Sequence, residues 1–393
     1  MLDAIADVGL DPGTGGYRRY AWTDADLELR EWFVAEAETR GMDVVEDGNG
    51  NQLAWWNPTR EGGKALLLGS HLDSVPDGGA FDGPLGVTSS YAALDRLRAD
   101  GFTPTRPIVV ANFADEEGAR FGIACAGSQL ATGALAPEKA LALKDRDGLT
   151  MAEVLAARGR DPRALGRSDW LSQVGTFVEL HVEQGRHLVH TGDAVGVATA
   201  IWPHGRWRLD FRGAADHAGA TRMEDRHDPM SAYAATVLAA RRLATDADAR
   251  ATFGRLEVAP GGTNAIPSRV RAWLDARAAT EDELEHLVDG IMDAAHEAAT
   301  ADATEVEPVA ESVSPAVTFD LPLRDRLATL LDAPVLPTGA GHDAGVLSPH
   351  VPTAMLFVRN PTGVSHSPAE HADDADCEAG VDALARVVET LAT

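Results

Sequence analysis

Short apolar runs alternate with alanine-rich helical stretches along most of this chain, and polar residues follow several of the runs directly. Strand-like runs lie at residues 65–69, 107–113, 176–180 and 353–358. Their alternation with helical stretches predicts βαβ units around a mainly parallel sheet, and therefore an α/β fold. Because sites in such sheets form at the carboxyl ends of the strands, we expect the residues after these runs to meet in one crevice.

Three histidines and three carboxylates stand in the segments after the runs. The segments are GSHLDSVPDGGAFDGPLG at 69–86, DEEGARFG at 115–122, VELHVEQG at 178–185 and VSHSPAEH at 364–371. Imidazole and carboxylate in this mixture suit a pair of zinc- or manganese-like ions, with one glutamate left over to act as a base. The residue types therefore predict a two-metal hydrolase. The residues concerned are His71, Asp82, Glu116, Glu117, His181 and His366.

The residue types also suggest roles within this set. Asp82 is placed to bridge two cations at a separation of roughly 3.5–4 Å. Asp73 is a carboxylate that can fix the imidazole tautomer of His71. Glu116 and Glu117 are neighbours and cannot both point the same way, so one can bind metal while the other faces the substrate water. Taken alone, each motif could be an ordinary turn or a solvated acidic turn, and the convergence of several favours a site.

Other polar residues are candidates for contacts with a substrate. Gln184, in HVEQG, offers a polar contact. The guanidinium of Arg277 suits a substrate carboxylate, and His217 or Asn264 suits a developing oxyanion. The last three could equally be plain surface residues. His342, in the glycine-rich segment GAGHDAG, fits a turn near the pocket better than a ligand.

The interval 204–314 has a pattern of its own. Two helical stretches stand among four strand-like runs, which predicts a small α+β domain. The α/β pattern resumes after it and supplies His366. We therefore expect a discontinuous catalytic domain of residues 1–203 and 315–393, interrupted by the domain at 204–314.

Charge and composition limit the partners and the location. Asp and Glu outnumber Lys and Arg by 61 to 34, for a net charge of −27. Such a surface repels phosphate backbones and anionic membranes, which argues against nucleic-acid and membrane partners. The dispersed acid predicts a halophilic protein, because concentrated salt screens self-repulsion. Two cysteines, no basic leader and no apolar stretch of membrane-spanning length predict a cytoplasmic location.

Together these segments resemble the amidase/hydantoinase/carbamoylase branch of the M20 metallopeptidase superfamily. The resemblance covers nearly the whole chain and adds DHAGATRM, GGTNAIPS, LDAR and GAGHDAG, in order, to the four segments above. It implies a zinc-exopeptidase type of catalytic domain with an inserted ferredoxin-like domain, which serves as a lid and a dimerisation domain. The chain departs from the family at Arg222, where Pro is frequent, and at Gly345, where Gln is frequent. Both departures bear on substrate specificity.

Carried over motif by motif, the resemblance implies two divalent cations, Zn, Mn, Co or Ni, whose ligand sets share Asp82. It also implies a homodimer in which His217 and Asn264 help to complete a site, in part across the dimer interface. The implied residues are His71 and His181 for one metal, Glu117 and His366 for the other, Glu116 as general base, and Gln184, His217, Asn264, Arg277 and, more weakly, Arg206 as substrate contacts.

The function predicted on this basis is hydrolysis of a linear C–N amide or ureido bond. The first candidate is an N-carbamoyl-L-amino acid hydrolase, which releases the amino acid, ammonia and carbon dioxide. Allantoate amidohydrolase is the alternative, followed by an aminoacylase or dipeptidase and by a catalytically silent binding protein. The glycine-rich segments match neither a P-loop nor a dinucleotide fingerprint, and no serine has the spacing of a nucleophile elbow.

Overall fold

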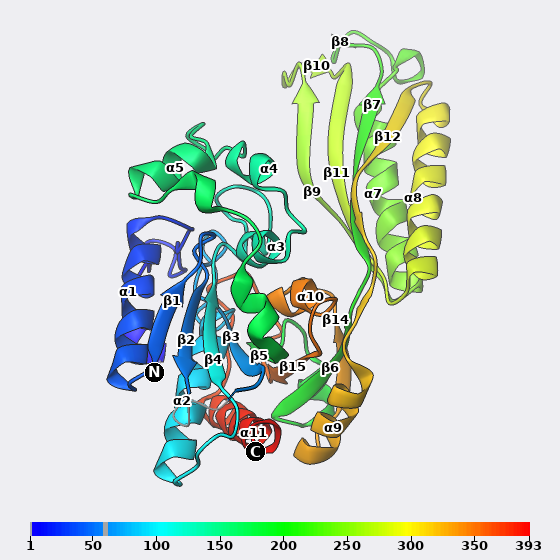
Figure 1. Ribbon diagram of the computed structural model, residues 1–393. Coiled ribbons are helices and arrows are strands. Elements are labelled where there is room, and N and C mark those ends of the chain that lie inside the picture. Colours follow the sequence, from blue (N-terminus) through cyan, green and yellow to red (C-terminus); the bar gives the residue numbers. More distant parts are fainter. Residues whose placement is uncertain (1, 58–61) are drawn as a thin grey trace. The chain divides into compact units, whose positions relative to one another are not determined.

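The computed structural model describes residues 2–57 and 62–393. The chain divides into two compact units. The first combines Met1–Ala200 with Thr318–Thr393, and the second is Ile201–Val317. The insert expected at 204–314 falls within the second unit, which Figure 1 draws in green to golden colours.

The first unit is built around a nine-stranded sheet. Its strands are β1 (Asp43–Glu46), β2 (Gln52–Trp56), β3 (Ala65–His71), β4 (Ile108–Phe113), β5 (Val174–Val182), β6 (Val195–Ile201), β13 (Val317–Thr318), β14 (Val335–Thr338) and β15 (Thr353–Val358). Their order is β1-β2-β4-β3-β5-β15-β6-β13, and β14 pairs with β6. The central strands β4, β3, β5 and β15 are parallel, whereas β1, β2 and β6 pair antiparallel. The mainly parallel sheet is thus confirmed, and its antiparallel margins were not predicted.

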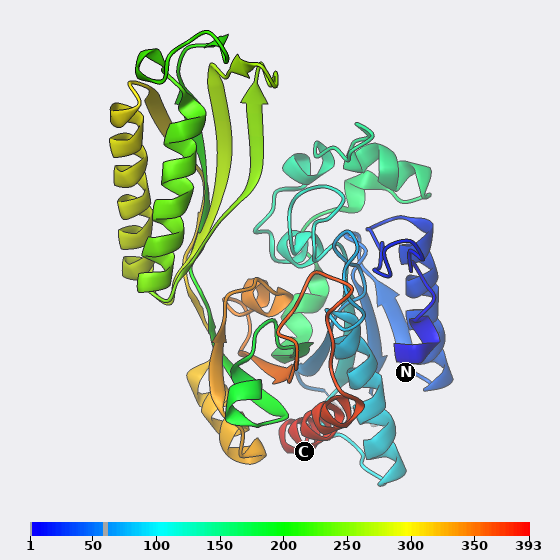
Figure 2. The same cartoon turned by 180° about the vertical axis from the view of Figure 1, so that it is seen from behind.

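Helices cover both faces of this sheet. On one face, α2 (Pro84–Ala99) and α11 (Asp374–Leu391) pack on each other and on the central strands, as Figures 1 and 2 show. The much shorter α10 (Asp343–Leu347) packs on β5 and β15. Every residue of β3, β4 and β15 is buried, as is typical of parallel strands that are covered on both sides.

The side chains of β5 point alternately to these two faces of the sheet. Leu180 and Val182 belong to the apolar core shared with α2 and α11. Because successive side chains of a strand point to opposite faces, Glu179 and His181 lie on the other side. The backbone N–H of Ala344 in α10 donates to Glu179 there, over 2.9 Å. A polar layer therefore lies beneath α10, on the face away from α2 and α11.

The end of β3 depends on a glycine. Gly69 has a φ of 123°, a left-handed value that residues with a side chain rarely adopt. A Cβ atom at this position would lie 2.1 Å from the carbonyl oxygen of Ala111 in β4. The close approach of the two strands allows only glycine here, two residues before His71.

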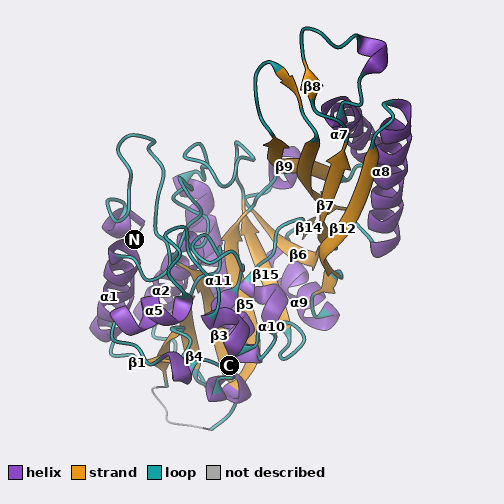
Figure 3. Ribbon diagram, turned by 90° about the horizontal axis from the view of Figure 1, so that it is seen from above, coloured by secondary structure: helices purple, strands orange, loops and turns teal. Residues whose placement is uncertain are grey.

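The second unit contains the predicted four strands and two helices. They are β7 (His204–Arg212), α7 (Pro229–Asp246), β9 (Arg250–Ala259), β11 (Arg269–Arg277), α8 (Glu281–Ala301) and β12 (Glu305–Ser314), with a small ladder of β8 (Asp216–His217) and β10 (Ala265–Ile266). The four long strands form an antiparallel sheet in the order β12-β7-β11-β9. Both helices pack on this sheet and on each other, as Figure 3 shows. Alternating burial along β11 matches a sheet with one covered face.

Local signals explain where several helices begin. The hydroxyl of Thr23 caps α1 (Asp24–Thr39) by accepting the N–H of Asp26. Thr280 and Glu283 form a capping box at the start of α8. The remaining α-helices are α3 (Ala126–Thr132), α4 (Pro137–Leu141), α5 (Met151–Ala157), α6 (His187–Thr191) and α9 (Leu321–Leu331). Within the described residues, every helix is too short or too polar to cross a bilayer.

Candidate metal centre

Two clusters of metal-ligating side chains share Asp82. His71, Asp82 and His181 form one cluster and Asp82, Glu117 and His366 the other, with ligand atoms within 4.8 Å of one another in each. Asp82 Oδ1 lies 3.1 Å from His181 Nε2, whereas Asp82 Oδ2 lies 3.7 Å from His366 Nε2. His366 Nε2 is also 3.4 Å from Glu117 Oε2. The structure thus brings together the five side chains expected as ligands.

These side chains come from the ends of neighbouring strands. His71 ends β3, and His181 stands near the end of β5. Glu117 follows β4, and His366 lies in the loop between β15 and α11. Parallel strands bring their carboxyl ends to one edge of the sheet, which explains how residues far apart in sequence meet.

The glycine that follows Asp82 allows this loop to pack closely against His71. Gly83, the next residue, has a φ of 83° and precedes α2. A Cβ atom there would lie 2.4 Å from the His71 ring, so any other side chain would push the loop away. The N–H of Gly83 donates to Nε2 of His181 over 3.2 Å. The loop that carries Asp82 is therefore packed directly on both imidazoles.

Main-chain carbonyls orient the two buried imidazoles. Nδ1 of His71 donates to the carbonyl oxygen of Asp73 over 3.1 Å, and Nδ1 of His181 to that of Val182 over 2.9 Å. A carbonyl only accepts, so Nδ1 carries a proton and Nε2 is the atom turned toward Asp82. In the described part of the chain, the buried Nε2 of His71 has no hydrogen-bond partner.

Charges in this pocket attract a cation. Burial alone would lower the pKa of His71, but Glu116 and then Asp73 and Asp82 raise it well above its ordinary value. Burial would raise the pKa of Asp82, but His181 and His71 hold it well below its usual range. Burial, reinforced by Asp82, raises the pKa of Glu117 to about 8. Divalent cations compete with protons for such groups.

The donor set fits a pair of divalent ions. Nitrogen and oxygen ligands of this kind suit Zn, Mn, Co and Ni alike. Oε1 of Glu117 is buried without a hydrogen-bond partner among the described residues, as is Nε2 of His71. A buried polar atom left without a partner carries a free-energy cost, which coordination to a cation would remove.

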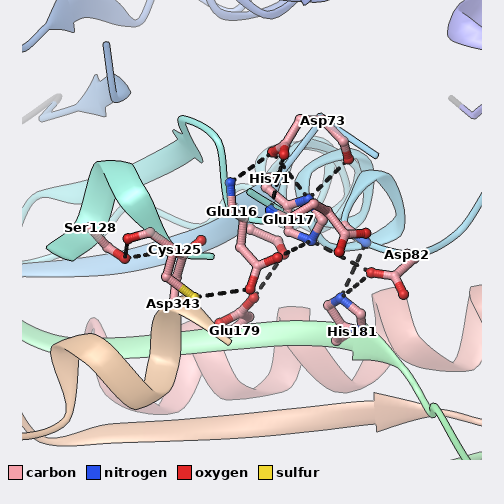
Figure 4. A network of polar contacts seen from close by, with 12 residues as sticks. His71, Asp73, Asp82, Glu116, Glu117, Cys125, Ser128, Glu179, His181 and Asp343 are labelled. Atoms are coloured by element: carbon pink, nitrogen blue, oxygen red, sulfur yellow. Dashed lines mark hydrogen bonds and ion pairs between the residues drawn. The ribbon is translucent and has the colours of Figure 1, made fainter. Parts of the chain in front are cut away.

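Glu116 stands beside the clusters without belonging to either. Its Oε2 lies 3.6 Å from Nε2 of His71, and its Oε1 accepts the thiol of Cys125 over 3.1 Å (Figure 4). Burial is the largest influence on its carboxyl, and with Glu117 it raises the pKa of Glu116 well above its ordinary value, against the effect of His71. The two adjacent glutamates therefore have different surroundings, as expected from their opposite directions.

Asp73 makes contacts beyond the expected one with His71. Its carboxylate accepts the backbone N–H groups of Glu116 and Glu117, over 3.1 and 3.0 Å. The carboxylate Oδ1 is 3.5 Å from Nδ1 of His71, farther than the carbonyl oxygen of Asp73 itself. The tautomer of His71 is thus set mainly by the main chain of Asp73, and the side chain of Asp73 holds the glutamate turn.

Several polar groups orient Asp82. Gln184, expected as a substrate contact, donates from Nε2 to Asp82 Oδ2 over 2.9 Å. The hydroxyl of Ser365 donates to the same oxygen over 2.8 Å. Glu370 accepts the backbone N–H groups of Phe81 and Asp82, each over 2.9 Å. Ser365 and Glu370 were not singled out from the sequence, although both lie in the VSHSPAEH segment.

A buried polar layer lies behind the clusters, and of its members only His342 was singled out from the sequence, as part of a turn near the pocket. The ring of His342 packs edge-on against His181, with centroids 4.5 Å apart, and burial lowers its pKa well below the ordinary value. Glu179 accepts the hydroxyl of Ser70 over 2.8 Å, and Asp343 accepts that of Ser128 (Figure 4). The signal available in the sequence was weak: Asp343 follows His342 in GAGHDAG, and Glu179 stands inside the strand-like run 176–180.

The remaining expected residues lie in the second unit. His217 and Asn264 are exposed neighbours, since the N–H of Ala218 donates to the carbonyl oxygen of Asn264 over 3.0 Å. Nδ1 of His217 accepts the N–H groups of Gly219 and Ala220, so its proton is on Nε2. The other two residues, Arg277 and Arg206, flank Asp275 at 2.8 and 3.5 Å.

Histidines and carboxylates gathered at the strand ends of an α/β sheet suit a two-metal hydrolase. The chain belongs to the Peptidase family M20/M25/M40, whose sequence pattern residues 67–390 match. It is 36% identical to an N-carbamoyl-L-amino acid amidohydrolase of Geobacillus stearothermophilus, over 100% of this chain and 97% of that protein. It is 31% identical to the allantoate amidohydrolase of Escherichia coli, over 100% and 96% of the two chains.

The fold is similar to that of a solved relative. A hydantoinase/carbamoylase family amidase from Burkholderia ambifaria superimposes with a TM-score of 0.86 at 32% identity, over 100% of this chain and 96% of that one. These findings confirm the predicted family, its amidase/hydantoinase/carbamoylase branch, and an enzyme that hydrolyses amides other than peptides.

Proposed function

We propose that this chain is a two-metal amidohydrolase that cleaves the ureido group of N-carbamoyl-L-amino acids. One observation carries the proposal: two ligand clusters share Asp82, and a separate buried carboxylate, Glu116, stands beside them. The amidohydrolase of Geobacillus stearothermophilus, at 36% identity, supports this choice of substrate.

The chain's own residues supply binding and proton transfer. His71 and His181 would hold one cation and Glu117 and His366 the other, with Asp82 between them. When bound, the two cations would polarise the substrate carbonyl and lower the pKa of water. Glu116 takes a proton from the attacking water and returns it to the leaving nitrogen, as one C–O bond forms and one C–N bond breaks. The carbamate formed in this step then loses carbon dioxide, which breaks the second C–N bond and releases the second nitrogen.

The substrate's carboxylate needs a cationic partner, and we assign it to Arg277. A guanidinium group can bind a carboxylate through two parallel hydrogen bonds. Asp275 accepts both Nε and Nη2 of Arg277, over 2.8 and 3.2 Å, and thereby fixes the orientation of the guanidinium group. Stabilisation of the oxyanion by His217, and substrate contacts by Asn264, Gln184 and Arg206, stay predictions from the sequence.

Allantoate amidohydrolase is the second candidate. Allantoate also carries ureido groups and a carboxylate, so the same groups would serve it. The relative from Escherichia coli, at 31% identity, favours this alternative. Aminoacylase or dipeptidase activity, and a silent binding protein, follow as less favoured alternatives.

Ammonia release decides among these candidates. Metal-free protein would be loaded in turn with Zn, Mn, Co or Ni and given N-carbamoyl-L-amino acids, their D forms, N-acetyl amino acids, dipeptides and allantoate. Release of ammonia and a free amino acid from the carbamoyl compounds is the expected result. Full metal occupancy without turnover of any compound would instead favour the silent binding protein.

A Glu116→Gln variant tests the assigned base. Turnover should fall by at least about a hundredfold, the usual contribution of a positioned base, while the metal content measured by mass spectrometry stays at two ions per chain. Loss of metal together with turnover would show that Glu116 is a ligand rather than a base.

The family resemblance also implies a lid role for the insert and a homodimer, and the composition predicts a cytoplasmic location. Light scattering would measure the mass in solution, and a monomer with full activity would contradict the dimer and any site completed across it.

A further inference from the structure

The thiol of Cys125 lies directly against the carboxylate of Glu116. Sγ is 3.1 Å from Oε1, whereas the other oxygen, Oε2, lies 3.6 Å from Nε2 of His71 (Figure 4). Cys125 and Glu116 are each only 5% exposed. The two oxygens of this carboxylate therefore have separate neighbours, a thiol on one side and a cluster of candidate metal ligands on the other.

The backbone holds this contact in place. Cys125 has φ 52° and ψ 35°, a left-handed conformation that is uncommon and costly for a residue with a side chain. It stands immediately before α3, and its N–H donates to the carbonyl oxygen of Glu116 over 2.5 Å. The next two N–H groups, of Ala126 and Gly127, donate to Asp115 and Ala114 over 3.0 and 2.9 Å. The start of α3 is thus tied to the turn that carries Glu116.

The thiol is the donor in this contact. Burial, and then the negative charges of Glu116 and Asp343, raise the pKa of Cys125 well above its ordinary value. The sulfur therefore keeps its proton, and an ionised Glu116, which is the form that a general base needs, can only accept a hydrogen bond from it. A thiol is a weak donor, but a hydrogen bond to a charged acceptor is stronger than one between neutral groups.

We propose that Cys125 is a positioning residue, whose S–H group holds Oε1 of Glu116 and thereby keeps Oε2 turned toward the metal-ligand clusters. Only the catalytic consequence depends on the proposed function; the hydrogen bond does not. The thiol touches Glu116 and neither cluster, so its removal should lower kcat while KM and metal content stay the same.

Three variants separate positioning from packing. Cys125→Ala removes the donor, and Cys125→Ser restores one in a smaller side chain. Cys377→Ala, in α11, is the matched control, because it removes the chain's second thiol. β-Branched replacements at 125 are unsuitable at a positive φ.

The first measurement needs no activity. With two cysteines in the chain, infrared spectra of the metal-loaded wild type and variants assign one S–H stretching band to each. The band lost in Cys125→Ala should lie below the frequency of an unbonded thiol. A band at the unbonded frequency overturns the proposal, even if the protein shows no amidohydrolase activity at all.

The second measurement is kinetic. Cys125→Ala should lower kcat about tenfold, the size of one hydrogen bond to a charged group, with KM and metal content within twofold of wild type. Cys125→Ser should recover most of the loss, and Cys377→Ala should match wild type. Equal losses in the Ala and Ser variants, or none in either, would overturn a positioning role. If the wild type shows no turnover, only the proposed function is contradicted. The infrared band still tests whether the thiol donates a hydrogen bond to Glu116.

Discussion

The position of the turn that carries Glu116 and Glu117 should depend on one carboxylate, that of Asp73. Asp73 accepts the N–H groups of both glutamates and is itself buried. Asp73→Asn keeps one accepting oxygen and replaces the other with an NH2 donor, which leaves one backbone N–H facing a donor. A buried unsatisfied group costs about 1–3 kcal/mol. In a domain of this size 1 kcal/mol shifts Tm by about 2–4 °C, so Tm should fall by roughly 2–12 °C.

Metal binding should weaken in the same variant. Displacing Glu117 removes a candidate ligand from its place, and loss of such an orienting contact typically lowers metal affinity about 10–100-fold. Scanning calorimetry of the chelated protein and titration calorimetry with Zn²⁺ or Mn²⁺ measure the two effects. Asp77→Asn is the control in the same loop, where a half-buried carboxylate pairs with Arg18 and accepts the hydroxyl of Thr14, away from the glutamate turn. Asp73→Asn with the Tm and metal affinity of wild type would refute the reasoning.

Two further predictions concern pH and salt. In the metal-free protein, burial and then Asp82 raise the pKa of Glu117 from 4.5 to about 8, so the folded state holds this proton more tightly than the unfolded chain. The resulting stability is complete below about pH 4.5 and is lost as the pH rises to about 8, so Tm should fall over this window, less steeply in Glu117→Gln. With a net charge of −27, Tm should also rise from low to molar KCl as self-repulsion is screened. A pH-independent Tm, or a higher Tm in low salt, would contradict the respective prediction.

The parts predicted from sequence are those with a strong local signal. The central strands are mostly buried on both faces, so β3, β4, β5 and β15 each contain an apolar run that the sequence shows. The marginal strand β1 is mostly exposed and only four residues long, and it carries no such run. The candidate ligands were found because each follows a run, and the rule for strand ends then places them together.

The groups that orient those ligands could not be predicted from the sequence, because only tertiary contacts define them. The proposed role of the Cys125 thiol depends on its left-handed backbone and on its distance to Glu116, and the sequence shows neither. Glu370 resembles any acidic loop residue until its carboxylate is seen to accept the N–H of Asp82. Asp73 was expected to orient an imidazole, and its two closer backbone donors appear only in three dimensions.

The groups that contact the candidate ligands reveal what the site requires. The carboxylates of Asp82 and Glu116 accept hydrogen bonds from neutral donors, namely an amide, a hydroxyl and a thiol. Oε1 of Glu117 is buried without a hydrogen-bond partner among the described residues. Within the described residues their ion-pair partners are histidines, and no lysine or arginine comes within 4.0 Å of any of the three. Buried carboxylates without a permanently charged lysine or arginine carry a large desolvation cost unless a proton, on the carboxyl or on a neighbouring histidine, or a metal ion supplies the opposite charge. Protons meet that need in the metal-free chain, as the raised pKa values of Glu116 and Glu117 indicate, and divalent cations would displace them. The positive charge that neutralises these carboxylates must therefore come from solution, as protons or as divalent cations. A metal-dependent hydrolase requires a site with this property.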